Sequence, residues 1–255
     1  MSKLPKQYRF VDLSDYGRGS ARLISNILQN TSVTPIHVTS WFIVAGLAAI
    51  VCMMCNYYIS AAFFLILKSV LDAADGELSR IKNTPSYTGR YYDSIADIIL
   101  NLLFLITISY LTSGTYLFLF LAFIGIQLQG TLYNYYYVIL RNNVAGDTTS
   151  RIFEDHIPNA LHGESQQTVN ILYKIYNALY IVFDKTIYLL DKGAVNSKPF
   201  PKWFMTLLST FGLGFHLLIM AIFLVFGWIE LIIPFFVYSS IFILVFIAIR
   251  KVFLK

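Results

Sequence analysis

Long apolar runs separated by short polar connections dominate this chain. We identify six runs of about 20 residues each, the length that an α-helix needs to cross the hydrocarbon core of a membrane. The six runs are residues 35–55, 61–80, 89–111, 117–140, 203–227 and 231–249. The pattern predicts an all-α, polytopic membrane protein with six transmembrane helices, which form a single domain over residues 35–255.

The composition supports this prediction. Of the 255 residues, 57% are hydrophobic and only 13% are charged, whereas about 25% of the residues in a typical soluble domain are charged. So few charged residues cannot cover the surface of a soluble enzyme, and the apolar content excludes a disordered chain. The two cysteines, Cys52 and Cys55, are too few for a disulfide framework.

Basic residues lie almost entirely on one side of the predicted membrane helices. All of the 19 Lys and Arg residues except Lys68 fall in the N-terminal segment, the connection at 80–90, the stretch 141–202 or the C-terminus. Six spans place these segments on one face, which the positive-inside rule makes cytoplasmic. We therefore expect the active site and both termini on the cytoplasmic side. We attribute the net charge of +5 to these segments and expect no nucleic-acid partner.

The N-terminal segment, residues 1–34, is expected to lie in the membrane interface. Residues 10–30 predict an amphipathic helix, with Leu23 and Ile27 on the apolar side and Arg22 on the polar side. No signal peptide is expected, because this segment is polar and lacks an apolar core followed by a cleavage site.

The stretch 141–202 is expected to be a cytoplasmic loop that contains a second interfacial helix. Residues 166–191 are ambiguous, because charged residues interrupt an otherwise apolar stretch. We favour an interfacial helix here, since a seventh span would place the basic C-terminus on the outer face. A membrane span remains the alternative.

Acidic residues occur where a membrane helix normally avoids them. Asp72 and Asp75 are three residues apart in the second run, and Asp93 and Asp97 are four apart in the third. These spacings place each pair on one face of its helix. A short connection joins the two helices and makes them antiparallel neighbours, so we expect all four carboxylates to face one cleft.

Four carboxylates in one cleft require compensating positive charge. A single charged side chain in a membrane helix costs about 2.5–3.5 kcal/mol on insertion scales, and two divalent cations would neutralise the whole group. Oxygen ligands select hard ions, so the sequence predicts two Mg²⁺ or Mn²⁺ ions at Asp72, Asp75, Asp93 and Asp97. Paired metal ions stabilise phosphoryl displacement in many enzymes.

Small and basic residues accompany these acids. Gly76, Ser79 and Gly89 leave room for a bulky ligand beside the carboxylates, and the planar guanidinium of Arg80 suits phosphate oxygens. Lys68, one turn before the first acid, is expected to pair with that carboxylate or to contact a phosphate, with snorkelling toward the interface as its alternative role. Together these residues predict a substrate that contains a pyrophosphate.

The complete pattern resembles the signature of a known family. Residues 72–97 follow D-x-x-D-G-x-x-S-R-x8-G-x3-D-x3-D. The CDP-alcohol phosphotransferase (CDP-alcohol phosphatidyltransferase) family carries the same pattern with alanine in place of Ser79. Residues 34–39 are also similar to the family segment T-P-N-x-x-T, with Ile36 in place of the asparagine.

This resemblance implies an enzyme that transfers a substituted phosphate from a CDP-linked donor to an alcohol acceptor and releases CMP, in phospholipid synthesis. One of the two substrates is a lipid. All four aspartates are implied as metal ligands, Asp93 and Asp97 as the catalytic pair, and Asp97 as the general base. The implied substrate-binding residues are Gly76, Ser79, Arg80, Gly89 and Thr39, to which we add Lys68. The family also implies a homodimer.

The identity of the substrates stays open at this point. One version uses CDP-diacylglycerol with a polar alcohol, and the other uses CDP-choline or CDP-ethanolamine with diacylglycerol. Outside the family, the alternatives are a catalytically inactive metal-binding scaffold and an ion-coupled transporter, since intramembrane acids often mark ion pathways. Clustering of all four acids at one end of their helices disfavours the transporter.

Overall fold

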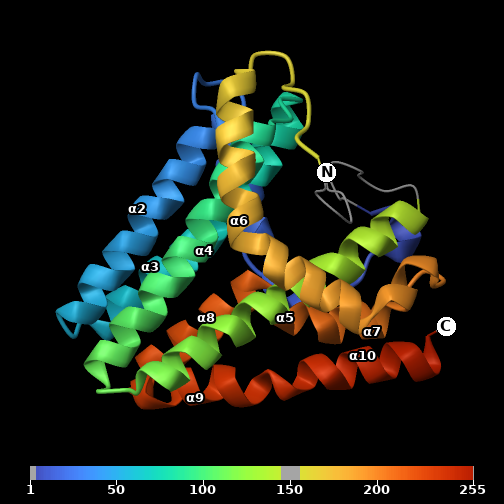
Figure 1. Cartoon of the computed structure of the whole chain (residues 1–255). Coiled ribbons are helices and arrows are strands. Elements are labelled where there is room, and N and C mark those ends of the chain that lie inside the picture. The colour runs from blue at the N-terminus through green and yellow to red at the C-terminus, as the bar shows by residue number, and fades with distance from the viewer. Residues whose placement is uncertain (1–3, 145–155, 255) are drawn as a thin grey trace.

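The computed structural model describes residues 4–144 and 156–254, and every regular element within these ranges is helical (Figure 1). This confirms the predicted all-α class. The α-helices are α1 (Arg18–Leu28), α2 (Pro35–Met54), α3 (Tyr58–Lys82), α4 (Tyr87–Leu111), α5 (Tyr116–Asn143), α6 (Gln166–Leu190), α7 (Lys202–Leu208), α8 (Leu213–Val225), α9 (Ile229–Ser239) and α10 (Ile241–Phe253). Short 3-10 helices are η1 (Lys6–Tyr8), η2 (Leu13–Asp15), η3 (Lys192–Asn196) and η4 (Ser209–Phe211).

Side-chain caps fix where the first long helices begin. The Thr34 hydroxyl accepts a hydrogen bond from the backbone N–H of His37, and Pro35 suits the first position of α2 because that position needs no amide donor. Ser86 and Thr115 cap α4 and α5 in the same way. The connections before these caps are short, so successive long helices run antiparallel.

Several helices are long and apolar enough to cross a membrane. In the part of the chain that the structure describes, four segments qualify, and a fifth qualifies if the bent pair of α7–η4 and α8 is counted as one span. The four are Pro35–Met54, Tyr87–Leu111, Tyr116–Asn143 and Ile229–Phe253. α3 is not among them, because Lys68, Asp72 and Asp75 interrupt its apolar stretch. The chain is an integral multi-pass membrane protein, and the number of six spans stays a prediction.

The long helices form two groups that diverge from the α4–α5 connection (Figure 1). α2, α3 and α4 make up the first group, in which α2 contacts both α3 and α4, and α8 lies against α3. α5, α9 and α10 make up the second group. α6 crosses between the two groups and contacts α4 and α5. The α3–α4 connection therefore lies where the two groups are far apart.

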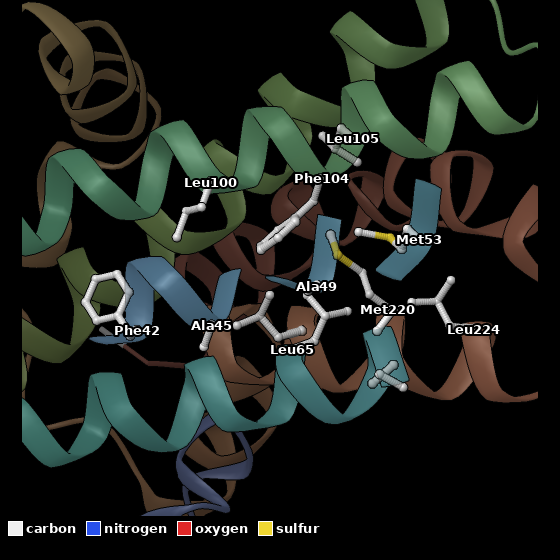
Figure 2. Packing of buried hydrophobic residues seen from close by; sticks show 14 of the residues in the cluster. Phe42, Ala45, Ala49, Met53, Leu65, Leu100, Phe104, Leu105, Met220 and Leu224 are labelled. Atoms are coloured by element: carbon white, nitrogen blue, oxygen red, sulfur yellow. The ribbon is translucent and has the colours of Figure 1, made fainter. Parts of the chain in front are cut away.

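Small side chains on α2 allow the first group to pack closely. Figure 2 shows Ala45 and Ala49 of α2 among Leu65 of α3, Phe104 of α4 and Met220 of α8. All five side chains are buried in one continuous core. Burial of a large apolar side chain contributes about 1.5–3 kcal/mol, so this core holds α3 and α4, the two acid-bearing helices, in a fixed relation.

The N-terminal helix is shorter than predicted. We expected a helix over residues 10–30, whereas α1 begins at Arg18. Before it, the Asp12 carboxylate accepts hydrogen bonds from the backbone N–H and the hydroxyl of Ser14 (3.0 and 2.6 Å). Such local side-chain hydrogen bonds compete with helix formation, and they end the helical pattern at this point.

α1 nevertheless presents the surface that an interfacial helix requires. Its Ser25 hydroxyl is buried against α3 and donates to the carbonyl oxygen of Ala74 (2.9 Å). On the opposite side, Leu23 and Ile27 are 64% and 66% exposed. Exposed large apolar side chains beside a membrane domain favour contact with lipid.

α6 is one continuous helix over the segment that the sequence left ambiguous. It is not among the candidate spans found in residues 4–144 and 156–254. Its buried face, which includes Val169 and Tyr176, packs against α4 and α5. The interfacial placement of α6 stays a prediction, and residues 145–155 of the preceding loop lie outside the described residues.

The fifth predicted run is bent, by 56° between α7–η4 and α8. Gly212 adopts an extended conformation there (φ −72°, ψ 148°) and separates the two helices. The N-terminal segment fills this break, where the Leu13 N–H donates to the Ser209 hydroxyl (2.8 Å). A β-carbon at Gly214 would overlap the carbonyl oxygen of Ser14, so a glycine is required for this contact.

We expect Gly214→Ala to destabilise the protein by about 1–3 kcal/mol, the typical cost of overpacking a core. Gly19→Ala is the matched control, because nothing lies within 4 Å of a β-carbon at Gly19 in α1 and alanine favours a helix by about 0.5–1 kcal/mol. Thermal unfolding of both variants in detergent checks this prediction. Equal midpoints for the two variants would contradict the close approach of Ser14 to α8.

Candidate metal centre and active site

The α3–α4 connection brings the two acid-bearing helix ends together. α3 ends at Lys82, and the residue that follows it, Asn83, adopts the left-handed conformation (φ 52°). The Ser79 hydroxyl donates to the carbonyl oxygen of Thr84 (2.9 Å), and the Ser86 hydroxyl accepts from the backbone N–H of Gly89 (2.8 Å). The turn is therefore closed by side chains on both sides, and α4 returns antiparallel to α3.

Three of the four predicted aspartates converge. Asp72 and Asp75 on α3 and Asp93 on α4 each offer a carboxylate oxygen, and these oxygens lie within 4.8 Å of one another. Asp97, the fourth acid of the pattern, lies outside this group of three. We call Asp72, Asp75 and Asp93 the aspartate triad.

The aspartate triad fits a divalent cation. Asp75 is only 8% exposed, and its Oδ2 accepts a hydrogen bond from the Thr39 hydroxyl (2.6 Å). Asp93 Oδ1 is buried and has no hydrogen-bond partner within the described ranges. A buried carboxylate oxygen without a partner is costly, and a bound cation would satisfy it. Since all the ligand atoms are oxygens, the triad suits a hard ion such as Mg²⁺ or Mn²⁺.

Lys68 lies against the other side of the cluster. Its side chain is 1% exposed, and its ammonium group donates to Asp72 Oδ2 (3.1 Å) and to Asp97 Oδ1. The ammonium also lies 4.4 Å from the centre of the Phe42 ring, in a cation–π arrangement. Lys68 thus links α3 to α4 through their carboxylates and does not snorkel toward the interface.

Comparison of this sequence with models of protein families shows which family the chain belongs to. The model of the CDP-alcohol phosphatidyltransferase family matches residues 32–233, which cover most of the chain and include the whole acidic pattern. The chain belongs to the CDP-alcohol phosphatidyltransferase family. The predicted resemblance is confirmed. A comparison with curated proteins finds no match.

The remaining residues of the CDP-alcohol phosphatidyltransferase pattern lie around the turn. A β-carbon at Gly76 would meet Arg80 Nη1 at 3.5 Å, so the arginine folds back over the glycine. Arg80 pairs with Glu77 (2.8 Å), while its Nε is buried without a hydrogen-bond partner in the described residues. The Ser79 hydroxyl, which replaces the alanine of the family pattern, is used to close the turn. Arg80 therefore places a basic group on the glycine-lined side of α3.

Sequence reasoning missed Glu164, which holds the start of α4. Its carboxylate accepts hydrogen bonds from the Ser86 hydroxyl and the Thr88 N–H (both 2.7 Å) and from the Leu161 N–H (3.0 Å). Partial burial opposes ionisation of Glu164, but these donors outweigh it and hold its pKa below the usual value. No local signal reveals this role, because the contact joins residues 76 positions apart.

Sequence reasoning also missed Tyr16 in the N-terminal segment. Its hydroxyl makes a hydrogen bond with Ser69, the neighbour of Lys68 on α3, and burial raises the pKa of Tyr16. The next residue, Gly17, packs closely against α3, because a β-carbon at this position would lie 2.8 Å from Val70 Cγ2. The N-terminal segment therefore packs against the part of α3 that carries Ser69 and Val70, next to Lys68 in the sequence.

Proposed function

We propose that this protein transfers a substituted phosphate group from a CDP-linked donor to an alcohol acceptor and releases CMP, in phospholipid synthesis. The observation that carries the proposal is the convergence of Asp72, Asp75 and Asp93 within the sequence pattern of the CDP-alcohol phosphatidyltransferase family. Phosphoryl transfer depends mainly on neutralisation of charge and on positioning, and the triad offers both when it binds a cation.

The aspartate triad would hold divalent Mg²⁺ or Mn²⁺, with Asp97 completing a site for two ions. When bound, such ions neutralise charge on the phosphate oxygens of the donor. Arg80 provides a planar cation for the same diphosphate. Gly76 and Gly89 add no side chain of their own where the nucleotide would approach, and the flexible Arg80 side chain lies over Gly76.

In the proposed reaction, the acceptor hydroxyl oxygen attacks the phosphorus distal to cytidine. The bond from that phosphorus to the bridging oxygen breaks, and CMP leaves with the bonding electrons. Asp97 accepts the proton of the attacking hydroxyl, as a general base at hydrogen-bonding distance would. In the donor-free protein, Lys68 donates a hydrogen bond to Asp97 Oδ1 and so fixes the position of this carboxylate before the substrates bind.

The two versions of the substrates predict different products. CDP-diacylglycerol and a polar alcohol would give an anionic or inositol-type phospholipid, whereas CDP-choline or CDP-ethanolamine and diacylglycerol would give a zwitterionic phospholipid. An ion-coupled transporter gains no support, because the carboxylates are gathered at one end of α3 and α4 and do not continue along these helices.

A substrate panel tests the proposed function. The purified protein is incubated with Mg²⁺, each CDP-alcohol and each acceptor in turn, CMP is measured, and the lipid product is identified by mass spectrometry. We expect CMP release that requires one donor together with one acceptor. Absence of CMP with every pair of substrates would contradict the transfer reaction. The same rate of CMP release with and without an acceptor would also contradict it.

Thr39 is expected to support the triad through Asp75. Thr39→Val keeps the shape of the side chain but removes the hydrogen bond to Asp75 Oδ2. Loss of such a supporting hydrogen bond lowers metal affinity or activity by about 10–100-fold. Titration of Mn²⁺ into the variant checks this, with Ser40→Ala as the control, since the Ser40 hydroxyl donates to the Ile36 carbonyl oxygen (3.0 Å) and lies 3.5 Å from the Tyr92 hydroxyl. Equal Mn²⁺ affinity in the two variants would contradict this role.

A further inference from the structure

Lys68 is a cation built into the carboxylate cluster. Its ammonium is buried between α3 and α4, where it binds one oxygen of Asp72 and one oxygen of Asp97. The Phe42 ring closes the remaining side at 4.4 Å. Within the described residues, the ammonium thus lies between two carboxylates and an aromatic face, and its side chain is 1% exposed.

This contact divides the four aspartates into two sets. The triad gathers its three ligand oxygens within 4.8 Å of one another, and Asp97 is held by Lys68 instead. Asp72 belongs to both sets, because a carboxylate has two oxygens that accept in different directions. One position in the cluster is therefore shaped by the triad, and a second, between Asp72 and Asp97, is already filled by a positive charge.

Charge balance makes Lys68 and a second divalent ion alternatives. Four carboxylates and one ammonium leave three uncompensated negative charges, and one divalent ion in the triad reduces them to one. A second divalent ion would reverse the sign of the cluster and would lie beside a buried ammonium, and like charges at short range in a protein interior repel strongly. The diphosphate of a donor would remove this excess of positive charge.

We propose that Lys68 occupies the position of a second cation in the donor-free protein. The protein then binds a single divalent ion, at the aspartate triad, and a second ion binds between Asp72 and Asp97 only when a nucleotide diphosphate is present and the ammonium moves aside. This inference rests on the proposed metal-dependent function. It gives Lys68 a role in setting the order in which the ions and the donor bind.

The test counts bound Mn²⁺ by electron paramagnetic resonance in the full-length protein, without and with CDP as the diphosphate probe. We expect one Mn²⁺ per chain without CDP, and a magnetically coupled Mn²⁺ pair with CDP, which also distinguishes ions in the site from Mn²⁺ bound to free nucleotide. Lys68→Met is expected to bind two Mn²⁺ ions without CDP. Lys174→Met, at an exposed position on α6, is the matched control and should behave as the unmodified protein does.

The outcomes separate this inference from the proposed function. Two Mn²⁺ ions in the unmodified protein without CDP would overturn the role of Lys68 and leave the metal-dependent function standing. A single Mn²⁺ in Lys68→Met would do the same. Absence of Mn²⁺ binding in the unmodified protein would overturn both. The comparison of the unmodified protein with and without CDP decides the matter even where Lys68→Met does not fold.

Discussion

Replacement of Asp97 by Asn is expected to reduce CMP release by about 10²–10⁴-fold, the usual contribution of a positioned general base. An amide cannot take the proton of the attacking hydroxyl. Mn²⁺ binding at the aspartate triad should persist, because Asp97 lies outside the group of three converging oxygens. Steady-state CMP release and Mn²⁺ titration on the same preparation check both halves of this prediction.

The control for this variant is Glu230→Gln, which removes one negative charge from an exposed position in α9. It should leave CMP release unchanged. Undiminished turnover in Asp97→Asn would remove Asp97 from the mechanism. Loss of Mn²⁺ binding together with turnover would instead make Asp97 a metal ligand of the donor-free protein.

Replacement of Asp93 by Asn is expected to abolish both tight Mn²⁺ binding and CMP release. Asp93 Oδ1 is buried without a hydrogen-bond partner in the described residues, so a cation is the group that would satisfy it. Loss of a direct ligand should lower Mn²⁺ affinity by more than the about 10–100-fold that follows loss of a supporting hydrogen bond. The effect should therefore exceed that of Thr39→Val.

Thermal stability provides the second measurement on Asp93→Asn. Without added metal, removal of a buried negative charge beside two other carboxylates should stabilise the variant relative to the unmodified protein. With added Mn²⁺, the order should reverse, because a ligand that binds only the folded state stabilises it. A variant with unaltered Mn²⁺ affinity would show that the converging oxygens do not bind the ion.

The acid-bearing helices were predictable because their signal is local. Spacings of three and four residues place Asp72 with Asp75 and Asp93 with Asp97, and the short turn between the helices brings Asp93 to α3. The position of Asp97 differs from the prediction that all four carboxylates would converge. Asp97 lies outside the triad and is bound by Lys68, and a sequence offers no means to decide which of several nearby carboxylates an ammonium will bind.

Other features depend on contacts between distant segments, so no local pattern could reveal them. Glu164 caps the start of α4 across 76 residues of sequence. At the bend, Gly212 lies against Ser14 and the Leu13 N–H donates to the Ser209 hydroxyl, so this contact joins opposite ends of the chain. Hydropathy predicts that residues 203–227 are apolar and helical, but it carries no information on a break filled by another segment.

The central claim is that carboxylates of α3 and α4 bind divalent ions that activate a CDP-linked donor. The dependence of CMP release on these ions tests this claim most directly. The purified protein is treated with a chelator, assayed with its donor and acceptor, and assayed again after addition of Mg²⁺ or Mn²⁺. We predict no CMP release in the chelator and full recovery with either ion. CMP release that continues unchanged in the chelator would contradict the claim.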